Sequence, residues 1–108
     1  MGWAESIGRS HPEVLFGVEL RYVLTDLMLR DPRVWRVREL ADALRRGGFD
    51  IGEQASRTIS GALRAEIDHG RVDRVGWGQY RATRHIPGST RRRIRARAAA
   101  RWRRMAGR

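Results

Sequence analysis

The sequence predicts a mostly α-helical chain with one small β-hairpin and a basic helix near its C-terminal end. Long segments carry apolar residues at helical spacing, one glycine-centred segment alternates as paired strands do, and the last segment is rich in arginine and alanine. At 108 residues the chain has room for one domain. We expect a flexible segment over residues 1–12, a domain over 13–84, and a linker with a basic helix over 85–108.

The first helix is expected over residues 13–30. Ser10 can cap its N-terminus, Pro12 suits the first turn and Glu13 completes a capping box. The apolar residues of this helix cover more than one stripe, so it needs cover on two sides. Either a second copy of the chain or the basic C-terminal helix can supply the second side, and the pattern does not choose between them.

The middle of the chain predicts two further helices with extended segments around them. Residues 34–37 are β-type, and a helix over 38–46 ends at Gly47–Gly48. After an extended segment over 49–51, a second helix spans about 56–69 and is capped near its start by Ser56. The buried seam of that helix is formed by apolar residues four apart, Ile59, Leu63 and Ile67.

The hairpin is expected over residues 71–82, with residues 76–78 as its loop. Its inward side chains are Val72, Val75, Tyr80 and Ala82. Residues 85–88 form a linker, and a final helix begins at Ser89 or Thr90 and ends near Met105. One side of this helix carries Ile94, Ala98, Trp102 and Met105.

The order of these segments resembles the winged helix-turn-helix superfamily. The resemblance is carried by Leu40–Phe49, Ser56–Leu63 and Gly70–Arg81, and it covers residues 15–83. Within the superfamily the chain is most similar to HARE-type domains, whose wing commonly reads Arg-Val-Gly-x-Gly-x-Tyr, as Arg74–Tyr80 does here. The resemblance implies a winged helix-turn-helix with a basic C-terminal helix added. It also implies DNA binding, with helix 56–69 in the major groove and the wing, residues 71–82, against backbone or minor groove.

Charge divides the chain unevenly and points to a polyanionic partner. All 23 basic residues are arginine, and all 12 acidic residues lie at or before Asp73. Residues 1–73 therefore carry 11 arginines against 12 acids, a net charge of −1, whereas residues 74–108 carry 12 arginines and no acid, a net charge of +12. A nearly neutral body with a cationic end is typical of partner-binding proteins, with nucleic acid as the commonest partner, ahead of an acidic membrane surface or an acidic protein.

With the apolar seam turned inward, the opposite side of helix 56–69 carries candidate contact residues. Arginine can bind guanine edges or phosphates through its planar fork, and Gly61 removes a side chain where a helix must approach closely. The predicted contacts from this helix are Arg57, Thr58, Ser60 and Arg64. The alternative is that Arg57 and Arg64 are solvated surface charges, with Arg64 paired to Asp68.

The wing and the basic helix supply the other candidates. We expect Arg71, Arg74 and Arg81 to contact phosphates from the wing, and Arg91, Arg92, Arg93 and Arg95 to do so from the final helix. Trp77 departs from the pattern at the wing tip, where a basic residue is easier to explain. It either stacks on a base, wedges a groove or caps the domain's own core. The basic helix is expected to fray without a polyanion, and an anionic membrane is its competing partner.

Catalysis has little support in the sequence. The chain has no cysteine, and its three histidines lie in different segments without metal-binding spacing. We therefore expect no enzyme activity, no cofactor and no metal. Three classes of function remain open: a DNA-binding protein (a transcriptional regulator or a nucleoid-associated protein), an RNA- or ribosome-associated protein, and a winged-helix protein-interaction module. DNA is favoured over RNA, a homodimer through helix 13–30 is possible, and no membrane segment is expected. The expected location is cytoplasmic, at the nucleoid in a bacterium.

Overall fold

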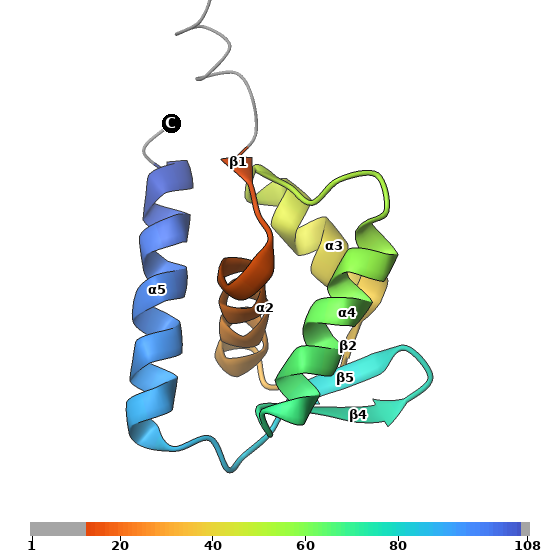
Figure 1. The fold of residues 1–108 in the computed structure, drawn as a ribbon, viewed down its shortest axis with the longest axis vertical. Helices are drawn as coiled ribbons and strands as arrows, with labels where there is room; N and C mark the ends of the chain where they lie inside the picture. The colour runs from red at the N-terminus through yellow and green to blue at the C-terminus, as the bar shows by residue number, and fades with distance from the viewer. Residues whose placement is uncertain (1–12, 107–108) are drawn as a thin grey trace, which may run out of the picture.

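The computed structural model describes residues 13–106, which are mostly helical with small β-sheets (Figure 1). The helices are α2 (Gly17–Arg30), α3 (Val37–Arg46), α4 (Ala55–Asp68) and α5 (Gly88–Ala106). The strands are β1 (Glu13–Val14), β2 (Trp35–Arg36), β3 (Phe49–Asp50), β4 (Val72–Gly76) and β5 (Gln79–Ala82). Within the described residues, no helix has the length and apolar character needed to cross a membrane.

Helix α2 lies at the centre of the molecule (Figure 1). Helix α5 packs along one side of it and α4 packs against the other side, while α3 packs against α4. The side chains of α2 that face these neighbours are fully buried, as expected for a helix that is apolar over most of its circumference. The core around α2 includes Leu20, Val23, Leu24, Met28, Leu40, Leu44, Ile59, Leu63 and Ala98.

An antiparallel sheet of three strands, in the order β2-β5-β4, closes one end of the helical body. Trp35 of β2 pairs with Tyr80 of β5, and Tyr80 pairs on its other side with Arg74 of β4. The indole N–H of Trp35 donates to the Asp31 carbonyl oxygen at 2.9 Å, which fixes β2 to the end of α2. The β4–β5 hairpin is therefore attached to the body along β5 and projects beyond it.

The first helix begins later than the sequence predicts. Residues Glu13–Val14 form β1, which pairs in parallel with β3, and α2 starts only at Gly17. The Leu15 N–H donates to the Asp50 carbonyl oxygen at 3.0 Å, and the Leu15 side chain is 1% exposed. Burying Leu15 against β3 requires an extended backbone, which is why the capping box expected at Glu13 is wrong. Ser10 and Pro12 lie outside the described residues.

The C-terminal helix is part of the core and not a separate tail. Ile94 and Ala98 of α5 are fully buried against the helical body. Trp102 packs edge-on against Phe49, with ring centroids 5.0 Å apart and an angle of 74° between the rings. Of the two covers considered for the first helix, the structure shows α5. A homodimer through helix 13–30 stays a prediction: α5 covers much of the second side, while Val14, Phe16 and Val18 remain exposed at the start of this segment.

Helices α3 and α4 match their predicted ranges to within one residue at each end. Gly48 has the left-handed backbone expected after α3, with φ of 90°. The cap predicted for α4 is wrong, because Ser56 lies inside the helix and Gln54 precedes its first residue. Val75 of the hairpin is also misassigned: a register shift between Arg74 and Gly76 leaves it 40% exposed.

Candidate nucleic-acid interface

Helix α4 has one buried side and one polar, exposed side. Ile59 and Leu63 are fully buried, and Ile67 is partly buried, so most of the predicted seam is confirmed. The opposite side is open to solvent along the whole helix and carries Arg57, Ser60, Gly61, Arg64 and Asp68, while Thr58 is partly exposed beside it. The exposed side faces away from α2 and therefore away from α5 (Figure 1).

The two arginines on this side are not used by the fold. Among the described residues, neither Arg57 nor Arg64 makes a hydrogen bond, ion pair or ring contact, and the pair expected between Arg64 and Asp68 does not form. A Cβ at Gly61 would meet no other part of the described structure within 4 Å, so the helix surface is open at that position. Both guanidinium groups are thus available to an external partner.

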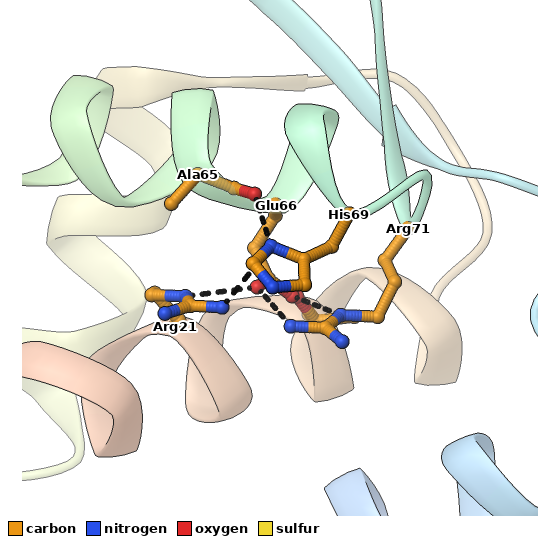
Figure 2. Close-up of polar contacts among 6 residues, drawn as sticks. Arg21, Ala65, Glu66, His69 and Arg71 are labelled. Atoms are coloured by element: carbon orange, nitrogen blue, oxygen red, sulfur yellow. Dashed lines mark hydrogen bonds and ion pairs between the residues drawn. The ribbon is translucent and has the colours of Figure 1, made fainter.

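A buried ion cluster holds α4 in place, and Glu66 is its centre (Figure 2). Arg71 binds both carboxylate oxygens of Glu66, with Nε 2.9 Å from Oε1 and Nη2 2.6 Å from Oε2. The Thr25 hydroxyl donates to Oε1 at 2.5 Å, and Arg21 Nε donates to Oε2 at 3.0 Å. Thr25 and Arg21 belong to α2, so this carboxylate joins α2, α4 and the residue that precedes β4.

Electrostatics keep Glu66 ionised in this cluster. Burial raises the pKa of Glu66. The hydrogen bonds from Arg71, Thr25 and Arg21 together lower it by more than burial raises it, so the pKa lies below its usual value of 4.5. The same contact with Glu66 raises the pKa of Arg71. A paired, fully hydrogen-bonded carboxylate in the interior is expensive to break, so the cluster fixes the angle at which α4 presents its outer side.

Arg71 is therefore not a phosphate contact, and that prediction is wrong. The residue is 6% exposed, and its guanidinium Nε and Nη2 are both bound to Glu66. The physical reason is that Arg71 follows the end of α4 directly, where the chain turns back towards the buried carboxylate. His69 lies beside the cluster, with Nδ1 2.9 Å from the Ala65 carbonyl oxygen and 3.4 Å from Arg21 Nη2 (Figure 2). It caps the last turn of α4.

The hairpin loop presents Trp77 to solvent. The Trp77 side chain is 91% exposed, so the interpretation that it caps the core is wrong. The Arg74 guanidinium lies 4.8 Å from the centre of the Trp77 ring, and its Nε donates to the Gly76 carbonyl oxygen at 3.3 Å. Trp77 and Gly78 form the two-residue loop between β4 and β5. Gly78 has φ of 63°, a left-handed backbone that allows this tight turn. The loop therefore carries a flat aromatic ring with a cation stacked on it.

The remaining candidate arginines lie at or beyond the hairpin base. Arg81 is exposed on β5 and shares a hollow of about 460 Å³ with Arg84 and Arg91. Arg91 is half-buried where α5 begins, whereas Arg92, Arg93 and Arg95 are exposed along α5. These α5 side chains lie on the opposite side of α2 from α4 (Figure 1), so the structure does not gather all predicted contact residues on one face.

Glu66 is the important residue that sequence reasoning missed. It lies three residues after Leu63 and seven after Ile59, which is the spacing of the buried seam. A carboxylate at a seam position indicates a buried partner, and Arg71 is the nearest following arginine. That signal was available in the sequence.

Comparison with known proteins and a search for metal-ligating side chains both leave the site without an assigned chemistry. The chain matches no protein family, no curated protein and no solved structure. Among residues 13–106, no group of three or more histidine, cysteine, aspartate or glutamate side chains is arranged to hold a metal ion.

Proposed function

We propose that this chain is a winged helix-turn-helix DNA-binding protein, acting as a transcriptional regulator or a nucleoid-associated protein. Helix α4 lies in the major groove, and the β4–β5 hairpin serves as the wing against the backbone or minor groove. The observation that carries the proposal is the outer side of α4. Arg57 and Arg64, which have no partner within residues 13–106, flank a glycine on a helix that a buried ion cluster ties to α2.

The arrangement of the sheet supports the same proposal. The hairpin projects from the body on the α4 side of the molecule and is hydrogen-bonded through β5 to β2, which precedes α3 (Figure 1). The exposed Trp77 and its stacked Arg74 lie at the end of this projection. An aromatic ring and a cation at a protruding tip suit a sugar-phosphate groove, where the ring packs and the guanidinium meets phosphate.

The test measures affinity for duplex DNA and for RNA of matched length. Wild-type protein is titrated by fluorescence anisotropy against a random pool of duplexes of about 30 base pairs, roughly three helical turns. Arg57→Ala/Arg64→Ala should bind at least about tenfold more weakly, since loss of one good arginine–base contact costs about 1–3 kcal/mol. The comparison variant is Arg93→Ala/Arg103→Ala, which removes the same charge from α5 on the opposite side of α2 and should weaken binding clearly less than the α4 variant does.

The competing classes give different results in the same assay. If RNA displaces the DNA at equal length, the chain is an RNA-binding protein and the major-groove proposal is wrong. If neither polymer binds at low salt, the remaining class is a protein-interaction module. Equal losses in the two double variants would show that charge alone, and not the outer side of α4, accounts for binding.

A further inference from the structure

We infer that the outward side of α5 is a second nucleic-acid-binding surface, and that one molecule holds two duplex segments at once. This inference rests on the proposed function, because the first segment is the one bound by α4 and the hairpin. It goes further by giving the basic helix a site and a partner of its own. We call the two surfaces the α4 face (Arg57, Arg64 and Arg74) and the α5 face (Arg92, Arg93 and Arg103).

The two faces point in opposite directions. Helix α2 lies between α4 and α5 and packs against both (Figure 1). Ile94 and Ala98 fix which side of α5 faces α2, and Ile59 and Leu63 do the same for α4. With interaxial distances of about 8–10 Å and helix diameters of about 10 Å, the two outer surfaces lie roughly 30 Å apart.

One duplex cannot reach both surfaces of one molecule. DNA has a persistence length of about 150 base pairs, so a short segment behaves as a stiff rod. A rod lying against the α4 face would have to turn back on itself to contact the α5 face, on the far side of three helices. The arginines of α5 therefore need a different segment.

The α5 face has the layout of a phosphate-binding ridge. Arg92 and Arg93 are exposed near its start and Arg103 near its end, with no acidic residue anywhere on the helix. Eleven residues correspond to about three helical turns, so the two ends lie on the same side and roughly 16 Å apart. Between them, helical spacing places the exposed Ala96 and Ala100 on this side. The exposed Arg95 and Arg97 lie at its flanks, where Arg97 pairs with Glu19 of α2. A duplex can thus approach closely between two cationic ends.

The burial pattern favours nucleic acid over a membrane surface. Membrane binding by a basic helix requires an exposed apolar side that enters the lipid boundary. In α5 that side is turned inward: Ile94 is fully buried, and Trp102 and Met105 pack against the core. Only arginine, serine, glycine and alanine side chains are exposed on α5, which suits a hydrated polyanion.

The experiment captures one duplex with another. A biotinylated duplex of about 30 base pairs, far shorter than the persistence length, is fixed to beads and incubated with protein and a fluorescent duplex of the same length. Protein retained on the beads measures the proposed function, and fluorescence retained measures the second site. Wild-type protein should retain both. Arg92→Ala/Arg93→Ala/Arg103→Ala should remain on the beads but capture at least about fivefold less fluorescent duplex, because three phosphate contacts are lost.

Two further variants separate the explanations. Arg92→Lys/Arg93→Lys/Arg103→Lys keeps the charge and should capture at near wild-type level. Arg57→Ala/Arg64→Ala/Arg74→Ala removes the same charge from the α4 face and should lower capture as strongly as the α5 alanine variant. If the α5 alanine variant captures as well as wild type, bridging arises from paired copies of the chain and the inference is wrong. If the beads retain wild-type protein but no fluorescent duplex, the proposed function stands and the inference of a second site is wrong. If the beads do not retain the protein, both the proposed function and the inference are wrong.

The same beads test the membrane alternative. Vesicles containing about 30% anionic lipid, a mixture to which polybasic segments bind electrostatically, are added together with the fluorescent duplex. We expect them not to compete with duplex capture. Competition at equal phosphate concentration would assign the α5 face to lipid and overturn the inference.

Discussion

Arginine residues a few positions apart have opposite environments in this molecule. Arg71 is buried and donates from Nε and Nη2 to Glu66, while Arg64 is exposed and has no partner among the described residues. Arg74 lies between these extremes, stacked on an exposed tryptophan. Because all three have the same chemistry, only their position relative to the buried seam of α4 decides which of them can meet a ligand.

Glu66→Gln tests the buried ion cluster. The change leaves Arg71 buried without a counter-charge, and breaking a buried pair costs about 3–5 kcal/mol. We expect the free energy of unfolding at pH 7 to fall by about 3 kcal/mol, measured by urea denaturation followed by circular dichroism. The matched control is Glu53→Gln, at an exposed glutamate, which should change stability by less than about 0.5 kcal/mol. Equal stability of the two variants would mean that Glu66 does not hold α4.

The same variant should change the response of stability to acid. The pKa of Glu66 is lowered in the folded state, so its contribution is present above the unfolded value of 4.5 and is lost as pH falls through the folded value. Asp26 affects stability in the opposite direction. Burial raises its pKa in the folded state, so its destabilising effect grows as pH rises from the unfolded value of 3.8 to the folded-state pKa. Wild-type protein should therefore lose stability below about pH 4.5, and Glu66→Gln should lose less of its own stability there.

Trp77→Ala separates binding from folding at the hairpin tip. A side chain that is 91% exposed contributes little to the core, so stability should change by less than about 0.5 kcal/mol. If the ring stacks on a base or packs in a groove, duplex affinity should fall by about 5- to 100-fold, corresponding to roughly 1–3 kcal/mol. Trp77→Phe keeps an aromatic face and should retain most of the affinity. Unchanged anisotropy titrations for Trp77→Ala would exclude contact by the tip.

At the scale of helices and strands, alanine substitutions at two glycines should change the stability of the fold in opposite directions. Gly61→Ala places a methyl group in open space on a helix, so it should stabilise the fold by about 0.5–1 kcal/mol. If α4 lies against DNA there, the same variant should bind duplex more weakly. At Gly47 a Cβ would come within 2.2 Å of the Trp102 ring, and Gly47→Ala should destabilise by about 1–3 kcal/mol. Thermal unfolding measures the stability of both variants, and anisotropy titration measures their affinity for duplex DNA. Unchanged affinity of Gly61→Ala would show that α4 does not approach DNA closely at this position.

Local patterns predicted most helices, but contacts distant in sequence decided where α2 begins and where α5 lies. Spacing and glycine signals located α3, α4 and the hairpin because these depend on neighbouring residues. The start of α2 depends instead on Leu15 reaching β3, thirty-five positions away at Asp50, and capping residues carry no information about that contact. Helix α5 shows the same limit, because its arginine content suggested a frayed tail while Ile94 and Ala98 pack it into the core.

Because α5 packs into the core, a substitution on its buried side should lower the stability of the whole domain, although its composition alone suggests a separate tail. Ile94→Ala removes a fully buried side chain and should lower the free energy of unfolding by about 2–5 kcal/mol. Arg93→Ala, one position earlier on the exposed side, should change it by less than about 0.5 kcal/mol. Urea denaturation of both variants checks this difference. Similar values would mean that α5 does not pack on α2 in solution.

For the whole molecule, the structure divides the positive charge over two sides where the sequence suggested one cationic end. The sequence gives the net charge of +11 and its concentration after Asp73. It does not give the direction of each arginine, because that follows from helix packing: α4 and α5 turn their apolar residues towards the same central helix. The candidate residues were therefore largely predictable as exposed arginines, while their division between two faces was not.

This division makes a prediction about salt. If about 6 phosphates are neutralised, the logarithm of duplex affinity should fall with the logarithm of salt concentration at a slope near −5. Arg57→Ala/Arg64→Ala should reduce the steepness by about 2 where both arginines contact phosphates, because each phosphate contact accounts for roughly one counterion, and should leave it unchanged where both contact base edges. A duplex bound by the α4 face does not reach α5, so Arg93→Ala/Arg103→Ala should leave the slope for that binding nearly unchanged. Anisotropy titrations from low to physiological salt measure all three slopes, and an equal reduction in both double variants would show that one duplex contacts both faces.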